Sequence, residues 1–210
     1  MRLWCTTCLR HLAVKFISFP LLVYQSLEST SPSRVDVWTG KDLTSLTKLG
    51  TVITDDTDPG VWYSFRDDLV HIYAEDGDFQ SGVSSGKISH WTTPSNDLLN
   101  ATEQSTAIDV TDRPYKLGDA DLVRFRGRYW MFIDKTNDHP NYDTMVWVSD
   151  DLYNWEEYQE SITSNFGTGD LSVVKVGQNR FRGCSEFTGG SSGQGKLGFW
   201  DLFFNDRYIK

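Results

Sequence analysis

Cysteine is scarce in this chain of 210 residues, and its three copies form no recognisable framework. An odd and sparse set of cysteines does not indicate a disulfide-stabilised fold. Cys5 and Cys8 have the spacing of half a zinc site, but no second pair follows them, and His11 is the only further candidate ligand nearby. We therefore expect neither disulfides nor a metal site.

Positive charge is also in short supply, because 20 lysines and arginines face 29 aspartates and glutamates, for a formal net charge of -9. Proteins that bind nucleic acids draw their affinity from clustered Lys and Arg side chains. The composition thus predicts no nucleic-acid partner, and solubility explains the negative charge. A Gly/Ser-rich stretch at 189–195 lacks the strand, helix and Lys-Ser/Thr of a phosphate-binding loop, so we expect no cofactor.

Long apolar runs are missing as well. The longest mainly apolar stretch, 16–24, contains Pro20 and is far shorter than the roughly 20 residues that cross a bilayer. We expect no membrane partner. Residues 1–30 form a separate N-terminal segment, interpreted as a weak export signal or as a partial strand, because the residues after the apolar stretch fit a cleavage site poorly. The sequence favours an extracellular location without deciding it.

Aromatic residues, in contrast, are abundant: eight Trp, nine Tyr and twelve Phe make up 14% of the chain. Aromatic rings favour β-strands, and they also form the platforms on which sugars stack. No long stretch follows the 3.6-residue period of a helix. The sequence therefore predicts an all-β protein.

An internal repeat indicates the architecture. A tryptophan followed by an Asp-Leu pair recurs at Trp38, Trp91 and Trp147, and after each pair an acidic residue opens a new strand. Turn residues such as those at 126–127 separate the short aromatic and β-branched runs. This order is typical of four-stranded antiparallel blades, and we predict a β-propeller over residues 31–210. A β-sandwich stays as an alternative, although it gives no reason for the order to recur.

The number of repeats leaves the propeller open. Three repeats occupy residues 35–200, and partial strands flank them, whereas a closed propeller needs at least four blades. We expect about three blades to be present. The chain is then a fragment, or it self-associates through open blade edges, whose unpaired backbone groups invite association.

Three motifs resemble glycoside hydrolase family 43 and its relatives in families 32, 62 and 68. The Asp-Pro-Gly-Val sequence at 58–61 is similar to their first-blade signature, and residues 118–132 are similar to their second blade. Residues 148–155 resemble the Ser-x-Asp-Leu-x-x-Trp turn that is common in them. The likeness extends over residues 35–188, and it implies a five-bladed β-propeller with a carbohydrate substrate.

The same resemblance implies catalytic roles for three acidic residues. Glycosidic cleavage needs one carboxyl group to protonate the leaving oxygen and another to activate water or attack carbon. Carried over by position, Asp58 matches the general base, or the nucleophile of the fructan-cleaving enzymes, and Asp170 matches the aspartate that modulates the acid. Glu186 is the only well-placed substitute for the general acid, although its alignment with Glu75 and Asp134 along the repeat favours a structural role.

The other candidates would bind substrate. Asp119 and Asp121 share the second-blade acidic position, and only one of them can reach the axis because they lie at different depths on one strand face. Trp62 and Trp130 are candidates for stacking on sugar rings, with a place in the core as the alternative. The resemblance implies a glycoside hydrolase acting on arabinan, xylan or fructan. A non-catalytic carbohydrate-binding propeller, or an inactive fragment, is the alternative.

Overall fold

The computed structural model describes residues 21–27, 32–42, 44–77, 86–138, 141–159, 162, 168–187 and 196–203. Within these ranges, residues 21–27, 136–138, 141–142, 168–171, 185–187, 196–198 and 200 are described by their backbone alone. Most of the N-terminal segment 1–30 and the Gly/Ser-rich stretch 189–195 lie outside the described residues.

The described part of the chain is built from antiparallel β-strands, which confirms the all-β prediction. None of the described residues belongs to a helix long and apolar enough to cross a membrane. The strands are β1 (Leu21–Leu27), β2 (Arg34–Gly40), β3 (Thr47–Thr54), β4 (Asp56–Ser64), β5 (Leu69–Asp76), β6 (Lys87–Pro94), β7 (Thr102–Glu103), β8 (Ile108–Asp109), β9 (Lys116–Phe125), β10 (Arg128–Asp138), β11 (Asn141–Ser149), β12 (Glu156–Gln159), β13 (Thr168–Lys175), β14 (Arg180–Phe187) and β15 (Lys196–Phe203).

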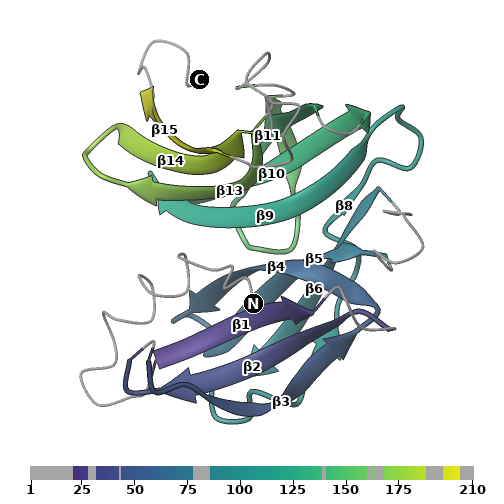
Figure 1. Cartoon of the computed structure of the whole chain (residues 1–210), viewed down its shortest axis with the longest axis vertical. Helices are drawn as coiled ribbons and strands as arrows, with labels where there is room; N and C mark the ends of the chain where they lie inside the picture. The colour runs from purple at the N-terminus through teal and green to yellow at the C-terminus, as the bar shows by residue number, and fades with distance from the viewer. Residues whose placement is uncertain are drawn as a thin grey trace.

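These strands form four sheets, each of which runs up and down in chain order (Figure 1). Sheet A contains β1 to β3, sheet B contains β4 to β7 with β8 paired to β6, sheet C contains β9 to β12, and sheet D contains β13 to β15. The repeated tryptophans occupy matching places, because Trp91 lies on β6 and Trp147 on β11, the third strands of sheets B and C. The repeat unit read from the sequence is therefore one blade.

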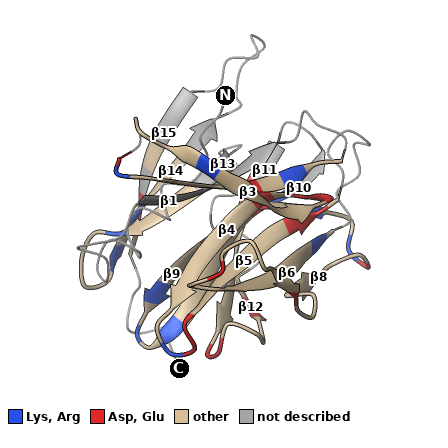
Figure 2. Ribbon diagram, turned by 90° about the horizontal axis from the view of Figure 1, so that it is seen from below, with Lys and Arg blue, Asp and Glu red and all other residues tan. Residues whose placement is uncertain are grey.

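Successive sheets pack face to face, and a separate apolar core fills each of the three gaps between them. The alternation of side chains along β4 divides that strand between two cores. Val61 and Tyr63 pack towards sheet A, whereas Trp62 packs towards sheet C. Leu122 and Val123 of β9 divide in the same way between sheets B and D. Figure 2, seen from below, shows charged residues in the turns and also within strands such as β9 and β10.

The strands that open sheets B and C are buried on both faces, which explains their nearly continuous apolar sequence. All residues of β4 except Asp58 are buried, whereas the third strand β6 alternates between buried and half-buried residues. Complete burial of a large apolar side chain contributes about 1.5–3 kcal/mol to folding. An arrangement of four sheets with three cores between them is a series of propeller blades rather than a two-sheet sandwich.

The hairpin between β9 and β10 shows how local sequence determines the register. Arg126 and Gly127 both adopt positive φ angles, 53° and 82°. A two-residue turn with both φ angles positive matches the right-handed twist of the flanking strands, and glycine adopts such angles at little cost. Phe125 consequently pairs with Arg128, as expected from the turn residues in the sequence.

Candidate functional site

The acidic residue that opens each blade lies in a β-bulge on the blade's first strand. A bulge inserts extra backbone into one strand, and it commonly redirects a side chain beside an active site. The three bulges occupy the same place in sheets B, C and D. They contain Asp58 between Thr57 and Gly60 on β4, Asp119 between Gly118 and Ala120 on β9, and Asp170 between Gly169 and Ser172 on β13.

Asp58 has the most distinctive backbone of the three. Its φ angle is 48°, in the left-handed region that aspartate tolerates better than most residues. It is half-buried, in contrast to the rest of β4, and the same exposure is found for Asp119 on β9. Both aspartates can therefore reach solvent from strands that are otherwise packed between sheets.

Neighbouring bulges touch one another across the sheet interfaces. A Cβ atom placed on Gly60 would overlap the carbonyl oxygen of Ala120, so the bulges of β4 and β9 meet backbone to backbone. The link from β9 to β13 is a hydrogen bond of 2.5 Å, which the Val173 amide donates to Asp121 Oδ2. The fold thus brings the strand segments that contain Asp58, Asp119 and Asp170 into one row of adjacent first strands.

Both carboxylate oxygens of Asp121 accept hydrogen bonds from backbone amides. Only 2% of the residue is exposed, its Oδ1 atom accepts a 2.8 Å hydrogen bond from the Leu122 amide, and its Oδ2 atom accepts the bond from Val173. Its carboxylate therefore joins sheets C and D, and of the two second-blade acids Asp119 is the one that lies in a bulge and reaches solvent.

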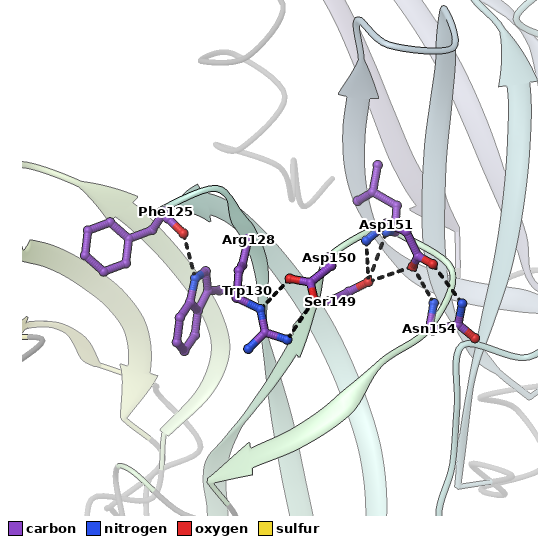
Figure 3. A network of polar contacts seen from close by, with 8 residues as sticks. Phe125, Arg128, Trp130, Ser149, Asp150, Asp151 and Asn154 are labelled. Atoms are coloured by element: carbon purple, nitrogen blue, oxygen red, sulfur yellow. Dashed lines mark hydrogen bonds and ion pairs between the residues drawn. The ribbon is translucent and has the colours of Figure 1, made fainter. Parts of the chain in front are cut away.

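The two tryptophans considered for sugar stacking lie in the cores. Trp62 is 7% exposed and packs edge-on against Tyr129, with ring centroids 5.6 Å apart. Trp130 is 2% exposed and donates a 3.1 Å hydrogen bond from Nε1 to the carbonyl oxygen of Phe125. Figure 3 shows this bond beside the turn that follows β11. Both rings are used for packing between blades.

A second set of acidic residues lies one strand further out. Glu75 pairs with Thr57, Asp134 with Gly118, and Glu186 with Gly169, so each acid stands opposite the residue that precedes a bulge. The registers confirm that Glu186 is the repeat equivalent of Glu75 and Asp134. For Asp170 and Glu186 only the backbone is described, and it places them next to one another in sheet D.

Asp56 is a further acidic residue close to the first bulge, and its importance was not evident from the sequence. It is 5% exposed, and its Oδ2 atom accepts a 2.8 Å hydrogen bond from Trp91 Nε1. Burial is the main reason that the pKa of Asp56 rises to about 7, and the nearby Asp76 carboxylate raises it further. A carboxyl group two residues before Asp58 is therefore about half protonated at neutral pH.

The turn after β11, residues 149–155, is held by its own polar side chains (Figure 3). Ser149 Oγ accepts hydrogen bonds from the amides of Asp151 and Leu152, and Asp151 Oδ1 accepts bonds from the amides of Tyr153 and Asn154. Partial burial raises the pKa of Asp151, but these hydrogen bonds outweigh it and lower the pKa to about 2. The motif that resembled a family signature therefore builds a rigid turn.

This turn rests on a buried histidine pair in sheet B. His71 and His90 are fully buried, and the Nδ1 atom of His71 lies 2.9 Å from Nε2 of His90, so one nitrogen donates and the other accepts. Tyr153 packs edge-on against both rings, and Tyr73 stacks on His90 and donates a 2.6 Å hydrogen bond to the carbonyl oxygen of Leu152. Among the residues with described side chains, no group of three or more His, Cys, Asp or Glu is placed to hold a metal ion.

No protein-family description and no curated protein matches the sequence. Solved structures do match the fold. A thermostable family-43 glycoside hydrolase is similar with a TM-score of 0.72 and 15% identity, over 91% of this chain and 70% of that one. An endo-arabinase from Bacteroides thetaiotaomicron gives a TM-score of 0.69 and 11% identity, over 90% and 73% of the two chains.

A family-32 β-fructofuranosidase from Bombyx mori is similar with a TM-score of 0.68 and 10% identity, over 91% of this chain but 45% of that one. Identities this low establish the fold and leave the activity open. The four sheets described here therefore belong to the five-bladed β-propeller fold that the family 43 and family 32 glycoside hydrolases share.

Proposed function

We propose that this protein is a glycoside hydrolase that cleaves a poly- or oligosaccharide of the arabinan, xylan or fructan type with paired carboxyl groups. The observation that carries the proposal is the row of equivalent bulges, which places one acidic residue at the same point of three adjacent first strands. Acids in chance positions would not recur in the same bulge. A row of carboxyl groups on adjoining blades is what a two-carboxylate reaction requires.

Asp58 takes the role of general base towards water, or of nucleophile towards the anomeric carbon. Support comes from its partial exposure in an otherwise buried strand and from its left-handed backbone, a conformation often found at functional sites. Strain of this kind is retained where the surrounding structure supports it, and the contact between Gly60 and Ala120 supplies such support. The other strand residues of β4 are buried, so none of them competes for the role.

The acidic part of the reaction is assigned to sheet D. Glu186 is proposed as the general acid and Asp170 as the residue that raises its proton affinity, because like charges held close together favour the protonated form of one of them. Support comes from the register, which sets Glu186 opposite the residue before Asp170. Asp119, on the strand between Asp58 and Asp170, is proposed to bind sugar hydroxyl groups.

The substrate class is taken from the relatives of similar fold, which include an endo-arabinase and a β-fructofuranosidase. We therefore propose arabinose, xylose or fructose units as the sugars of the substrate.

The test is hydrolysis of arabinofuranosides, xylosides, fructosides and galactosides, with arabinan, xylan and inulin as polymers. Asp58→Asn is compared with Asp55→Asn, a matched control because Asp55 is exposed, also has a positive φ angle of 72°, and lies outside the bulge. Loss of a catalytic base costs about 10²–10⁴-fold in rate, so Asp58→Asn should fall by that factor while Asp55→Asn keeps its activity.

Equal activities of the two variants would refute the role of Asp58. If the folded wild-type protein turns over none of the substrates but binds a sugar in calorimetry, the protein is a carbohydrate-binding propeller instead.

A further inference from the structure

The carboxyl group of Glu75, in sheet B, lies beside the place where a side chain on Gly118 of sheet C would begin. Its Oε2 atom lies 3.3 Å from the point where a Cβ atom of Gly118 would be, and no other atom outside the adjacent residues comes within 4 Å of that point. Gly118 immediately precedes Asp119, the bulge residue of sheet C. A carboxyl group from sheet B thus completes the bulge of sheet C.

The direction of the side chains along β5 explains this contact. Tyr73 belongs to the core between sheets B and C, and Ile72 belongs to the core between sheets A and B. Because side chains alternate along a strand, Glu75 faces sheet C with Tyr73, and Asp76 faces sheet A with Ile72. Asp76 accordingly pairs with Asp56, on the other side of the sheet from the bulge of β9.

The arrangement repeats one blade later. Asp134 stands on β10 where Glu75 stands on β5, opposite the residue before the bulge. It lies on the same face of β10 as Phe132, which packs in the core between sheets C and D, and it is fully buried. Asp134 therefore faces the sheet whose bulge contains Asp170.

We propose that Glu75 is a positioning residue that sets the proton affinity of Asp119, the bulge aspartate in the next blade. The proposal deepens the function proposed above and rests on it for its catalytic meaning, but not for its electrostatics. A negative carboxylate near a second carboxyl group raises the pKa of the latter, so sheet B would adjust the acid of sheet C.

The charged groups on the strands around Asp119 must be considered together. The acidic ones are Asp56 and Asp58 on β4, Glu75 and Asp76 on β5, Asp121 on β9, Asp134 and Asp138 on β10, and Asp170 on β13, and the basic ones are Lys87 on β6, Lys116 and Arg124 on β9, Arg128 and Lys135 on β10, and Lys175 on β13. Lys135 is directed elsewhere, because its Nζ atom lies 3.9 Å from Asp143 Oδ2 and 5.0 Å from the centre of the Tyr115 ring. Glu75 places its Oε2 atom beside Gly118, the residue that precedes Asp119.

The experiment measures the carboxyl titration of Asp119 by carbon-13 NMR in three forms of the full chain. Glu75→Gln removes the charge and keeps the shape, and Asp76→Asn is the matched control because it removes the same charge from the opposite face of β5. We expect the apparent pKa of Asp119 to fall by about one unit in Glu75→Gln, because a neighbouring negative charge raises the pKa of a carboxyl group, and to stay unchanged in Asp76→Asn.

Equal shifts in the two variants would overturn the proposal. The contact itself is tested by Gly118→Ala, which should lower the melting temperature in the wild-type background but not in Glu75→Ala, where the added methyl group has room. A loss of the same size in both backgrounds would also contradict it.

These readouts separate the two proposals. If the wild-type protein hydrolyses a glycoside, kcat/KM of Glu75→Gln should hold to lower pH than that of Asp76→Asn, because Asp119, proposed to bind the sugar, stays ionised there, and an unmoved kcat/KM profile would contradict the positioning role. If the wild type hydrolyses nothing, the proposed function fails, and the titration of Asp119 still decides whether Glu75 sets its proton affinity.

Discussion

The buried histidine pair should make the protein less stable at low pH, and the buried Asp56 carboxyl group has the opposite effect over almost the same pH range. Burial, with a smaller effect of neighbouring His71, lowers the pKa of His90 to about 3, and burial also lowers the pKa of His71. In the unfolded chain a histidine takes up its proton near pH 6.5. The stabilising contribution of His90 is therefore complete above pH 6.5 and is lost as the pH falls from 6.5 towards 3, because only the unfolded chain binds the proton there.

Asp56 acts in the opposite direction over almost the same range. Its folded pKa of about 7 is raised above the ordinary aspartate value of 3.8, so the folded protein is the form that takes up the proton as the pH falls from 7 to 3.8. Each group changes the free energy of unfolding by about 1.4 kcal/mol per pH unit inside its range. Between pH 6.5 and 4.5 each contributes about 3 kcal/mol with opposite signs, so Asp56 offsets His90 in the wild-type protein, while the lowered pKa of His71 adds to the effect of His90.

The perturbation that separates them is Asp56→Asn, which removes the opposing group. Urea unfolding at pH 4.5, 5.5 and 6.5 should show an unfolding free energy that falls on acidification by about 3 kcal/mol more in Asp56→Asn than in the wild type. Adding His90→Gln, which cannot bind a proton, should reduce the dependence again. The double variant will be less stable at every pH, because it also loses the ring contacts with Tyr73 and Tyr153, so the slope and not the absolute stability is compared. A slope for Asp56→Asn no steeper than that of the wild type would refute the reasoning.

Two substitutions test the contacts between blades. Gly60→Ala should lower the free energy of unfolding by about 2 kcal/mol or more, because its methyl group would overlap the Ala120 carbonyl oxygen, whereas Gly177→Ala, whose added atom would lie 3.5 Å from Arg180, should change it by less than about 1 kcal/mol. Asp121→Ala should cost about 2–4 kcal/mol in urea unfolding, because it leaves the buried Val173 amide without its acceptor, and a loss no greater than that of the exposed Asp112→Ala would show that the bond contributes nothing.

The repeat was the part of the sequence that predicted the structure best. Tryptophans and acidic residues at matching positions indicated the blade, its strand order and the three bulge aspartates Asp58, Asp119 and Asp170. Such features are periodic, and a short pattern that recurs in one order leaves few folds open. The tight turn at 126–127 was also predicted, because the conformation of a two-residue turn depends mainly on the turn residues themselves.

The features that escaped prediction depend on contacts between blades. Composition does not tell whether Trp62 and Trp130 face a core or a ligand, because both places favour aromatic rings. The raised pKa of Asp56 comes from burial beside Trp91, and the contact between Glu75 and Gly118 joins residues of different sheets. A bulge also interrupts the alternation by which strand faces are assigned, so the exposure of Asp58 within a buried strand could not be read from spacing.

In the described part of the chain, the three apolar cores each lie between two sheets, which has a consequence for how the protein folds. A single blade cannot bury its apolar faces, so the smallest cooperative unit is a pair of adjacent blades. Each blade is a local meander of strands that are close in sequence, so it should form quickly. Its stability comes from apolar contacts with the neighbouring blades. The described sheets should then behave as an array with nearest-neighbour coupling. A substitution in one interface should destabilise the two blades that form it and have little effect on the others.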